Sequence, residues 1–155
     1  VWYVNSILGI FRLEEENDAI CGLTLCPDGV PELEPLPRKV CETPLLQEAE
    51  EQLNEYFAGA RREFDLPLAP KGTPFQKAVW AEMCRIPYGE TRTYGQLAAA
   101  VGKPKASRAV GGACHCNPIA ILQPCHRVVG STGKLTGYAY GVEMKQYLLE
   151  LEQQE

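Results

Sequence analysis

The residues best suited to chemistry lie side by side in the segment Pro124-Cys-His-Arg-Val128. A cysteine acts as a nucleophile only as a thiolate, and a neighbouring base or cation favours that form. His126 could take the proton of Cys125 directly or through a water molecule, and a carboxylate could orient the imidazole. Adjacency alone proves little, because a Cys-His pair also fits a buried cysteine beside a polar neighbour.

Two short helices are predicted upstream, over 93–101 and 104–116, and a glycine-containing turn separates them. Such a pair is typical of a helix-turn-helix. Basic side chains gather at the start of the second helix, where backbone N–H groups also favour phosphates: Lys103, Lys105 and Arg108. A reactive cysteine beside a DNA-reading element indicates chemistry on DNA. Because bases inside a duplex are inaccessible, the target nucleotide would have to be flipped out.

The remaining elements are predicted from periodicity and from start and stop signals. Residues 1–30 alternate apolar and polar character and are predicted to form two or three strands. Residues 119–122 are apolar throughout, which favours a buried strand or connector. Helices are predicted over 44–58, 73–86 and 142–152, a short strand within 61–68, and a linker over 67–74.

Composition bounds the class of protein. With 155 residues, 45% of them hydrophobic, the chain suits one compact unit or two small ones. It has no apolar run of the roughly 18–20 residues that a membrane helix needs and no signal pattern, so we expect a cytoplasmic or nuclear protein. The seven cysteines are odd in number, which argues against a disulfide framework.

Charge is divided unevenly along the chain, although its net charge is −5. Residues 1–70 contain five basic and fourteen acidic side chains, whereas residues 85–134 contain seven basic side chains and one acidic side chain. This division indicates a basic working face on an acidic support, although uneven surface charge without function gives the same pattern.

A longer stretch of the sequence carries a family resemblance. Asn117-Pro-Ile-Ala-Ile-Leu-Gln-Pro-Cys-His-Arg-Val-Val129 closely resembles the active-site signature of the O6-alkylguanine-DNA alkyltransferases, also called methylated-DNA–protein-cysteine methyltransferases. The resemblance extends through Tyr94-Gly-Gln-Leu-Ala98, Ala106-Ser-Arg-Ala-Val-Gly-Gly112 and Gly133-Lys-Leu-Thr-Gly-Tyr138. It implies an α/β protein. Residues 1–70 would form a ribonuclease-H-like α/β domain, and residues 71–155 a mostly helical, winged-helix-like domain with the helix-turn-helix and active site.

The same resemblance implies irreversible, stoichiometric repair of alkylated DNA. Cys125 would attack the alkyl carbon, mainly methyl, on O6 of a flipped guanine, and O4-alkylthymine is a second expected substrate. His126 would relay the thiol proton through a water, Glu152 would orient His126, and Tyr94 would donate to a ring nitrogen of the leaving base. Asn117 would tie together the turn between recognition helix and active site. The alkyl group comes from DNA, so no cofactor and no metal are expected.

Contacts with double-stranded DNA in its minor groove are also implied by the resemblance. Arg108 would enter the base stack in place of the flipped nucleotide. The other implied DNA-binding residues are Tyr94, Lys105, Ala106, Ser107 and Gly111. The substrate pocket would be lined by Val128, Tyr138, Ala139 and Tyr140. We expect a monomer that binds DNA and no membrane.

Two features depart from the family pattern. Tyr140 stands where many members have glycine, and we expect it to narrow the pocket in favour of methyl over benzyl groups. Cys114-His-Cys116 offers three soft ligands, but consecutive helical residues point in different directions and cannot all reach one ion. We therefore expect Cys114 in the core and His115 facing solvent or DNA. A zinc site at Cys21 and Cys26 is weakly indicated, because residues 1–70 contain no histidine.

Three other functions fit parts of the pattern. A DNA-binding module without transfer chemistry fits the helix-turn-helix, but relatives of that kind replace the nucleophile, and Cys125 is present. A Cys-His hydrolase of small acyl substrates would need an oxyanion hole and leaves the helix-turn-helix unexplained. The last alternative is a fragment of a larger transcription regulator fused to a methyltransferase.

Overall fold

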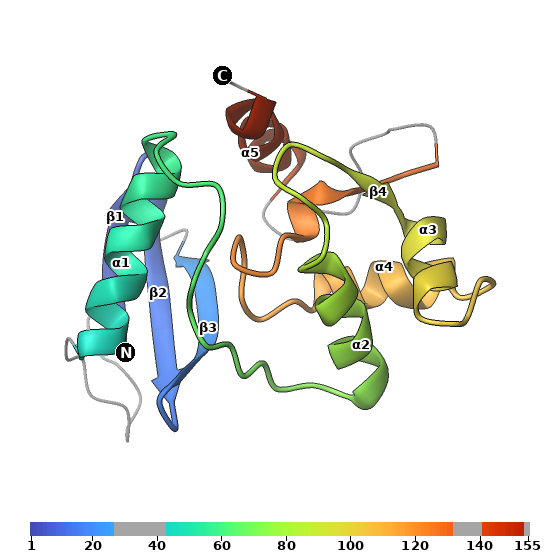
Figure 1. Cartoon of the computed structure of the whole chain (residues 1–155), viewed down its shortest axis with the longest axis horizontal. Coiled ribbons are helices and arrows are strands. Elements are labelled where there is room, and N and C mark those ends of the chain that lie inside the picture. The colour runs from blue at the N-terminus through green and yellow to red at the C-terminus, as the bar shows by residue number, and fades with distance from the viewer. Residues whose placement is uncertain (27–42, 132–140, 154–155) are drawn as a thin grey trace. The chain divides into compact units, whose positions relative to one another are not determined.

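A three-stranded antiparallel sheet is the centre of the N-terminal unit in this computed structural model, which describes residues 1–26, 43–131 and 141–153. Strands β1 (Trp2–Ser6), β2 (Gly9–Glu16) and β3 (Ala19–Cys26) lie in chain order and pair through tight hairpins (Figure 1). Asn17 and Asp18 take φ values of 53° and 62°, and two-residue hairpins favour positive φ at these positions. The meander predicted over 1–30 is therefore confirmed, with three strands.

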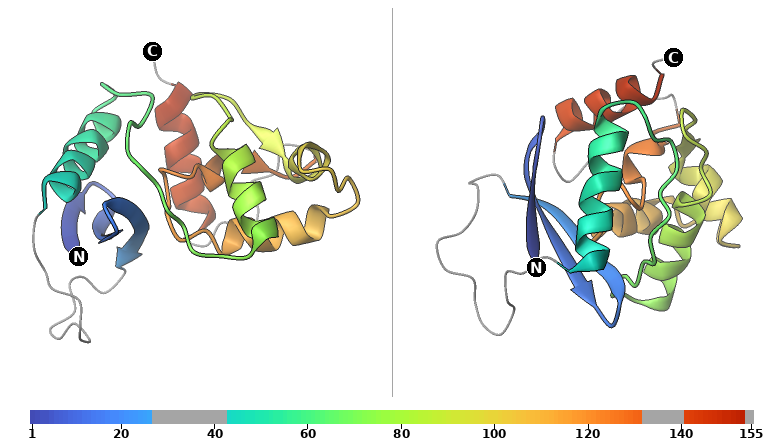
Figure 2. Two further views of the ribbon diagram at one scale, coloured as in Figure 1. Left: turned by 60° about the horizontal axis from the view of Figure 1, so that its bottom comes forward. Right: turned by 60° about the vertical axis from the view of Figure 1, so that its left-hand side comes forward.

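Helix α1 (Pro44–Phe57) packs along one face of this sheet (Figures 1 and 2). The hydroxyl of Thr43 accepts a hydrogen bond from the amide of Leu46, and Pro44 occupies the first turn, so the predicted start is confirmed. The core of the unit consists of side chains with no exposed surface: Phe11, Leu13, Ile20, Leu23, Leu46, Leu53 and Tyr56.

The short strand predicted within 61–68 is wrong. A single parallel bridge joins Leu68 to Ile20, and no strand forms over these residues. The physical reason is a side chain that replaces the strand partner. Buried Gln52 accepts from the amide of Asp65 at 2.9 Å and donates to its carbonyl at 3.2 Å, so the backbone groups of Asp65, in the middle of the segment, are satisfied without a sheet.

The C-terminal unit begins at Lys71, where the chain divides into two compact units. Helices α2 (Pro74–Met83) and α3 (Tyr94–Ala100) each start with a complete capping box, built on Thr73 and Thr93. Helix α4 (Ser107–His115) packs on both. The indole N–H of Trp80 donates to the carbonyl of Ala113 at 2.8 Å, which ties α2 to α4 inside the core.

Helix α4 begins three residues later than predicted. Residues 103–106 form a turn instead, in which the amide of Ala106 donates to the carbonyl of Lys103 at 2.9 Å. Pro104 occupies the second position of this turn, which suits its fixed φ as well as a first helical turn does. Lys103 and Lys105 therefore belong to the turn, and Arg108 belongs to the helix.

Two very short strands, β4 (Arg92–Thr93) and β5 (Val128–Val129), pair in parallel. One turn of 3-10 helix, η1 (Cys125–Arg127), directly precedes β5, and α5 (Val142–Gln153) packs on η1 (Figure 1). Residues 119–122 are buried but form a turned connector rather than a strand. None of the helices in the described ranges has the length and apolar character of a membrane span.

Candidate active site

The backbone around Pro124 fixes the position of Cys125. Pro124 has φ −81° and ψ 67°, and the amide of Cys125 donates to the carbonyl of Gln123 at 2.8 Å. This is an inverse γ-turn, for which the proline ring presets φ. Cys125 therefore begins η1 with its residue 5% exposed, inside a run of buried residues from Ile119 to Val129.

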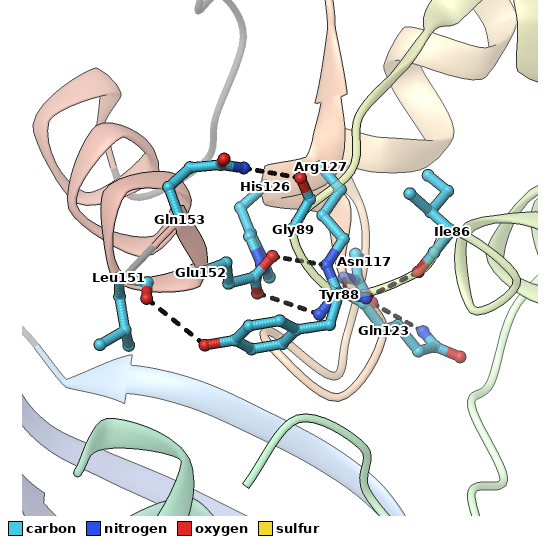
Figure 3. A network of polar contacts seen from close by, with 10 residues as sticks. All are labelled: Ile86, Tyr88, Gly89, Asn117, Gln123, His126, Arg127, Leu151, Glu152 and Gln153. Carbon is cyan, nitrogen blue, oxygen red and sulfur yellow. Dashed lines mark hydrogen bonds and ion pairs between the residues drawn. The ribbon is translucent and has the colours of Figure 1, made fainter. Parts of the chain in front are cut away.

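His126, Arg127 and Glu152 form a buried polar cluster between η1 and α5 (Figure 3). The Nε2 atom of His126 lies 2.6 Å from a carboxylate oxygen of Glu152. Arg127 donates twice to the same carboxylate, from Nε at 2.8 Å and from Nη2 at 3.0 Å. The structure thus brings His126 and Glu152 together at the spacing expected when the carboxylate orients the imidazole.

The charges of this cluster determine which nitrogen of His126 carries the proton. Burial by itself raises the pKa of Glu152, but hydrogen bonds from His126 and Arg127 outweigh it and lower that pKa to about 2. Burial lowers the pKa of His126, more than the hydrogen bond to Glu152 raises it. A neutral imidazole beside a carboxylate must donate from Nε2, so its Nδ1 atom holds a lone pair. Among the described residues, none hydrogen-bonds the buried Nδ1.

Arg127 anchors the cluster to the rest of the unit, a role that sequence reasoning did not assign to it. Its Nη1 atom donates to the carbonyl of Ile86 at 2.8 Å, and the guanidinium lies 5.7 Å from the centre of the Tyr88 ring (Figure 3). The available signal was a basic residue directly after Cys-His in an otherwise apolar segment, since a buried cation needs a buried anion.

Lys145 is the second site residue that sequence reasoning missed. Its side chain extends from α5 and is 1% exposed, and burial lowers its pKa while electrostatic attraction to Cys125 and Cys114 raises it. The ammonium also lies 5.8 Å from the centre of the Tyr94 ring. The helical spacing of Lys145, Leu148 and Glu152 places all three on one face of α5, which is a signal visible in the sequence.

Asn117 ties together the turn between α4 and the active site. Its Oδ1 atom accepts from the amide of Ile119 at 3.0 Å and from Nε2 of Gln123 at 2.7 Å. Its Nδ2 atom donates to the carbonyl of Gln123 at 2.8 Å. Both amides are buried, so the turn depends on these bonds rather than on water.

Most of the predicted DNA-binding residues lie in α4 or in the turn before it, and Tyr94 is the first residue of α3. Lys105, Ser107 and Arg108 are exposed. The N-cap residue of α4 is Ala106, which makes no side-chain hydrogen bond to the first N–H groups of the helix. Gly111 faces Tyr94: a Cβ atom at this position would lie 4.0 Å from the Tyr94 ring. Basic side chains and helix N–H groups together suit phosphate.

The predicted substrate pocket is described only in part. Val128 is completely buried, next to the cluster, whereas Tyr138, Ala139 and Tyr140 lie outside the described residues. Cys114 is 5% exposed, with its sulfur 3.6 Å from that of Met83; burial raises its pKa to about 12.

His115, the next residue, is exposed, so the predicted placement of both Cys114 and His115 is confirmed. Within the described residues, no three His, Cys, Asp or Glu side chains are placed to hold a metal ion.

Comparison with known families decides the relationship. The model of the 6-O-methylguanine DNA methyltransferase DNA-binding domain matches residues 74–154, and that of the ribonuclease-like domain matches residues 2–70. The chain belongs to the 6-O-methylguanine DNA methyltransferase family. The predicted family is therefore confirmed, and so is the fold class of a ribonuclease-like unit followed by a helical unit.

Individual relatives agree with this membership. A methylated-DNA–protein-cysteine methyltransferase of Methanosarcina barkeri is 61% identical over 107 residues, which are 69% of this chain and 68% of that protein. The constitutive enzyme of Bacillus subtilis is 58% identical over 112 residues, 72% of this chain and 68% of that protein. The crystal structure of Mycobacterium tuberculosis OGT in complex with DNA superposes with a TM-score of 0.87 at 42% identity, covering 98% and 91% of the two chains.

Proposed function

We propose that this family member is a methylated-DNA–protein-cysteine methyltransferase that repairs O6-alkylguanine in DNA. The sulfur of Cys125 forms a bond to the alkyl carbon, mainly methyl, while the bond between that carbon and O6 breaks and its electron pair stays on guanine. The product thioether is stable, so each molecule acts once. O4-alkylthymine presents the same kind of carbon–oxygen bond and is a second proposed substrate.

The arrangement of His126 is the observation that carries the proposal. Its Nδ1 atom is a buried acceptor, and the ionised Glu152 holds the opposite nitrogen as a donor at 2.6 Å. His126 therefore accepts the proton of the Cys125 thiol, through a water molecule, and Glu152 stabilises the imidazolium that results. This orientation supports the assignment of His126 as the proton acceptor.

Lys145 places a cation close enough to Cys125 to interact with it electrostatically. The buried ammonium of Lys145 attracts Cys125, and a cation beside a thiol stabilises its ionised form. Tyr94 lies next to that ammonium. We propose that the Tyr94 hydroxyl donates to a ring nitrogen of the departing guanine and so stabilises the charge that develops there.

DNA binding is proposed through α4 and its preceding turn. Lys105, Ala106, Ser107 and Gly111 would contact the backbone in the minor groove of double-stranded DNA, and Arg108 would replace the flipped nucleotide in the stack. Such contacts read shape rather than base sequence, as repair of scattered lesions requires. We further propose that the protein acts as a monomer, in the cytoplasm or, in a eukaryote, in the nucleus.

Mass spectrometry tests the function directly. The protein is mixed with an excess of a duplex that contains one O6-methylguanine, and Cys125→Ala is treated in parallel. We expect one added methyl group for each chain, on the peptide that contains Cys125, and none in the variant. Methylation of another cysteine, or bound duplex with no added mass, would overturn the proposal and favour a binding module.

A further inference from the structure

Two three-residue turns follow each other between Asn117 and Cys125. In the first, Ile121 has φ 69° and the amide of Leu122 donates to the carbonyl of Ala120 at 2.7 Å. A γ-turn with positive φ is rare and strained, above all at a β-branched residue. The second, around Pro124, is the relaxed kind that proline favours. The first turn therefore needs an external restraint, and the second does not.

Gln123 supplies a restraint from the far side of the strained turn. Its side chain lies in an apolar segment and is 3% exposed, yet its Nε2 atom donates to Oδ1 of Asn117 at 2.7 Å. Asn117 donates in return to the carbonyl of Gln123 at 2.8 Å. These two bonds join the side chain of Asn117 to the side chain and to the backbone carbonyl of Gln123 (Figure 3). Together with the chain between the two residues, they close a ring that contains Ile121.

The same carbonyl connects the ring to the nucleophile. The oxygen of Gln123 accepts from Asn117 and also, at 2.8 Å, from the amide of Cys125 itself. The orientation of this peptide group therefore sets where η1 begins. Displacement at carbon needs the sulfur in line with the breaking bond, and an error of 1 Å can reduce a rate by about 100-fold.

We propose that the side chain of Gln123 is a positioning residue for Cys125. It locks the carboxamide of Asn117, holds the strained turn at Ile121 closed and thereby aims the thiol at the alkyl carbon. This inference rests on the proposed function, in which Cys125 is the acceptor. Gln123 touches neither substrate nor sulfur, so its effect is on the rate of transfer and not on DNA affinity.

The first test is Gln123→Met, which keeps the length of the side chain and removes the donor. With saturating O6-methylguanine duplex, we expect the rate of methyl transfer to Cys125 to fall about tenfold or more. The dissociation constant for DNA should stay within about twofold, because the exposed residues of α4 are untouched.

Gln52→Met is the matched control in the N-terminal unit. Gln52 is also a buried glutamine, 2% exposed, and makes two hydrogen bonds to the backbone of Asp65. We expect both variants to lower the melting temperature, but only Gln123→Met to slow methyl transfer. If the two variants slow transfer equally, Gln123 has a merely structural role and the proposal is overturned.

Rescue gives a readout that loss of stability cannot imitate. Glycine adopts positive φ freely, so adding Ile121→Gly to Gln123→Met removes the strain that the lost bond restrained. The double variant should regain part of the transfer rate, and failure to regain any would overturn the proposal. Gln123→Glu is the alternative if Gln123→Met does not fold: only its protonated form donates to Asn117, so its rate relative to the wild type should rise as pH falls.

A DNA-independent measurement separates this inference from the proposed function. The rate at which iodoacetamide labels Cys125 is followed in the same variants, because the thiol must also be presented correctly to this reagent. If the wild type labels Cys125 but never takes a methyl group from DNA, the proposed function fails. In that case slower labelling in Gln123→Met still supports positioning, and equal labelling refutes it.

Discussion

Replacing Glu152 by glutamine separates the charge of this carboxylate from its shape. The residue is 4% exposed and accepts from His126 once and from Arg127 twice. A neutral amide of the same size cannot accept all three bonds, because one of its two ends is a donor. In Glu152→Gln the guanidinium of Arg127 therefore faces an N–H group in either orientation of the amide, and His126 faces one in the orientation that places the nitrogen at Oε2.

The effect on stability follows from the pKa of Glu152, which is about 2 instead of the ordinary 4.5. Each pKa unit corresponds to 1.36 kcal/mol, so the ionised carboxylate stabilises the folded state by about 3 kcal/mol. Because the folded pKa is depressed, this stabilisation is fully present above pH 4.5 and is lost as pH falls towards 2. The glutamine variant lacks a titrating group here, so its deficit should shrink over that range.

The effect on transfer follows from the tautomer of His126. Without a carboxylate at Nε2, the neutral imidazole can carry its proton on Nδ1, where it no longer accepts the thiol proton. General base catalysis contributes about 10²–10⁴-fold, so the first-order rate should fall by at least about 100-fold at pH 7.

Single-turnover transfer from an O6-methylguanine duplex gives the rate, and urea unfolding between pH 7 and 2.5 gives the free energy. Glu150→Gln is the control, since Glu150 is exposed on the same helix and accepts from Nε2 of Gln146 at 3.0 Å. A folded Glu152→Gln protein that transfers methyl at the wild-type rate would refute the proton-acceptor role. If the loss of stability in Glu152→Gln does not change with pH, the negative charge assigned to Glu152 is refuted.

Two further predictions concern the cation and the DNA face. Lys145→Met removes the buried ammonium, so labelling of Cys125 by iodoacetamide at pH 7 should slow about tenfold. The pH profile of this labelling should also move to higher pH. Unchanged labelling would mean that Lys145 does not stabilise the thiolate. Arg108→Ala removes an exposed side chain, so transfer from duplex should fall at least about tenfold while transfer from free O6-methylguanine base stays the same. An equal loss with both substrates would contradict a role in flipping.

Local signals predicted the helices well. Thr73 and Thr93 each precede a glutamine by three residues, and both form the capping boxes that this spacing predicts. The sequence places the start of α4 too early, because proline suits a turn as well as it suits the first turn of a helix. Only the hydrogen bond from the amide of Ala106 to the carbonyl of Lys103 shows that a turn forms here. The strand expected within 61–68 is wrong for a similar reason, since the side chain of Gln52 satisfies the backbone of Asp65.

The residues of the candidate site also divide into those that local sequence signals reveal and those that depend on distant partners. Cys125 and His126 are recognisable because their chemistry is local, and the family motif pointed to Glu152 and Asn117. Arg127 and Lys145 gain their roles from partners on other elements, so composition and spacing suggest only that a buried charge must be compensated. The strained turn at Ile121 is invisible to hydropathy, because an apolar run predicts burial and not the sign of φ.

The last turn of α5 carries Glu152, and helix ends commonly fray. Here that turn contacts the loop after α2, which holds it in place. The hydroxyl of Tyr88 donates to the carbonyl of Leu151 at 3.4 Å, Gln153 donates to the carbonyl of Gly89 at 2.6 Å, and a Cβ atom at Gly89 would lie 3.2 Å from the carbonyl of Glu152. Amide hydrogens in this turn should consequently exchange with solvent as slowly as those of the core. Their protection factors would then report, without any substrate, the fraction of molecules in which the proton acceptor is assembled.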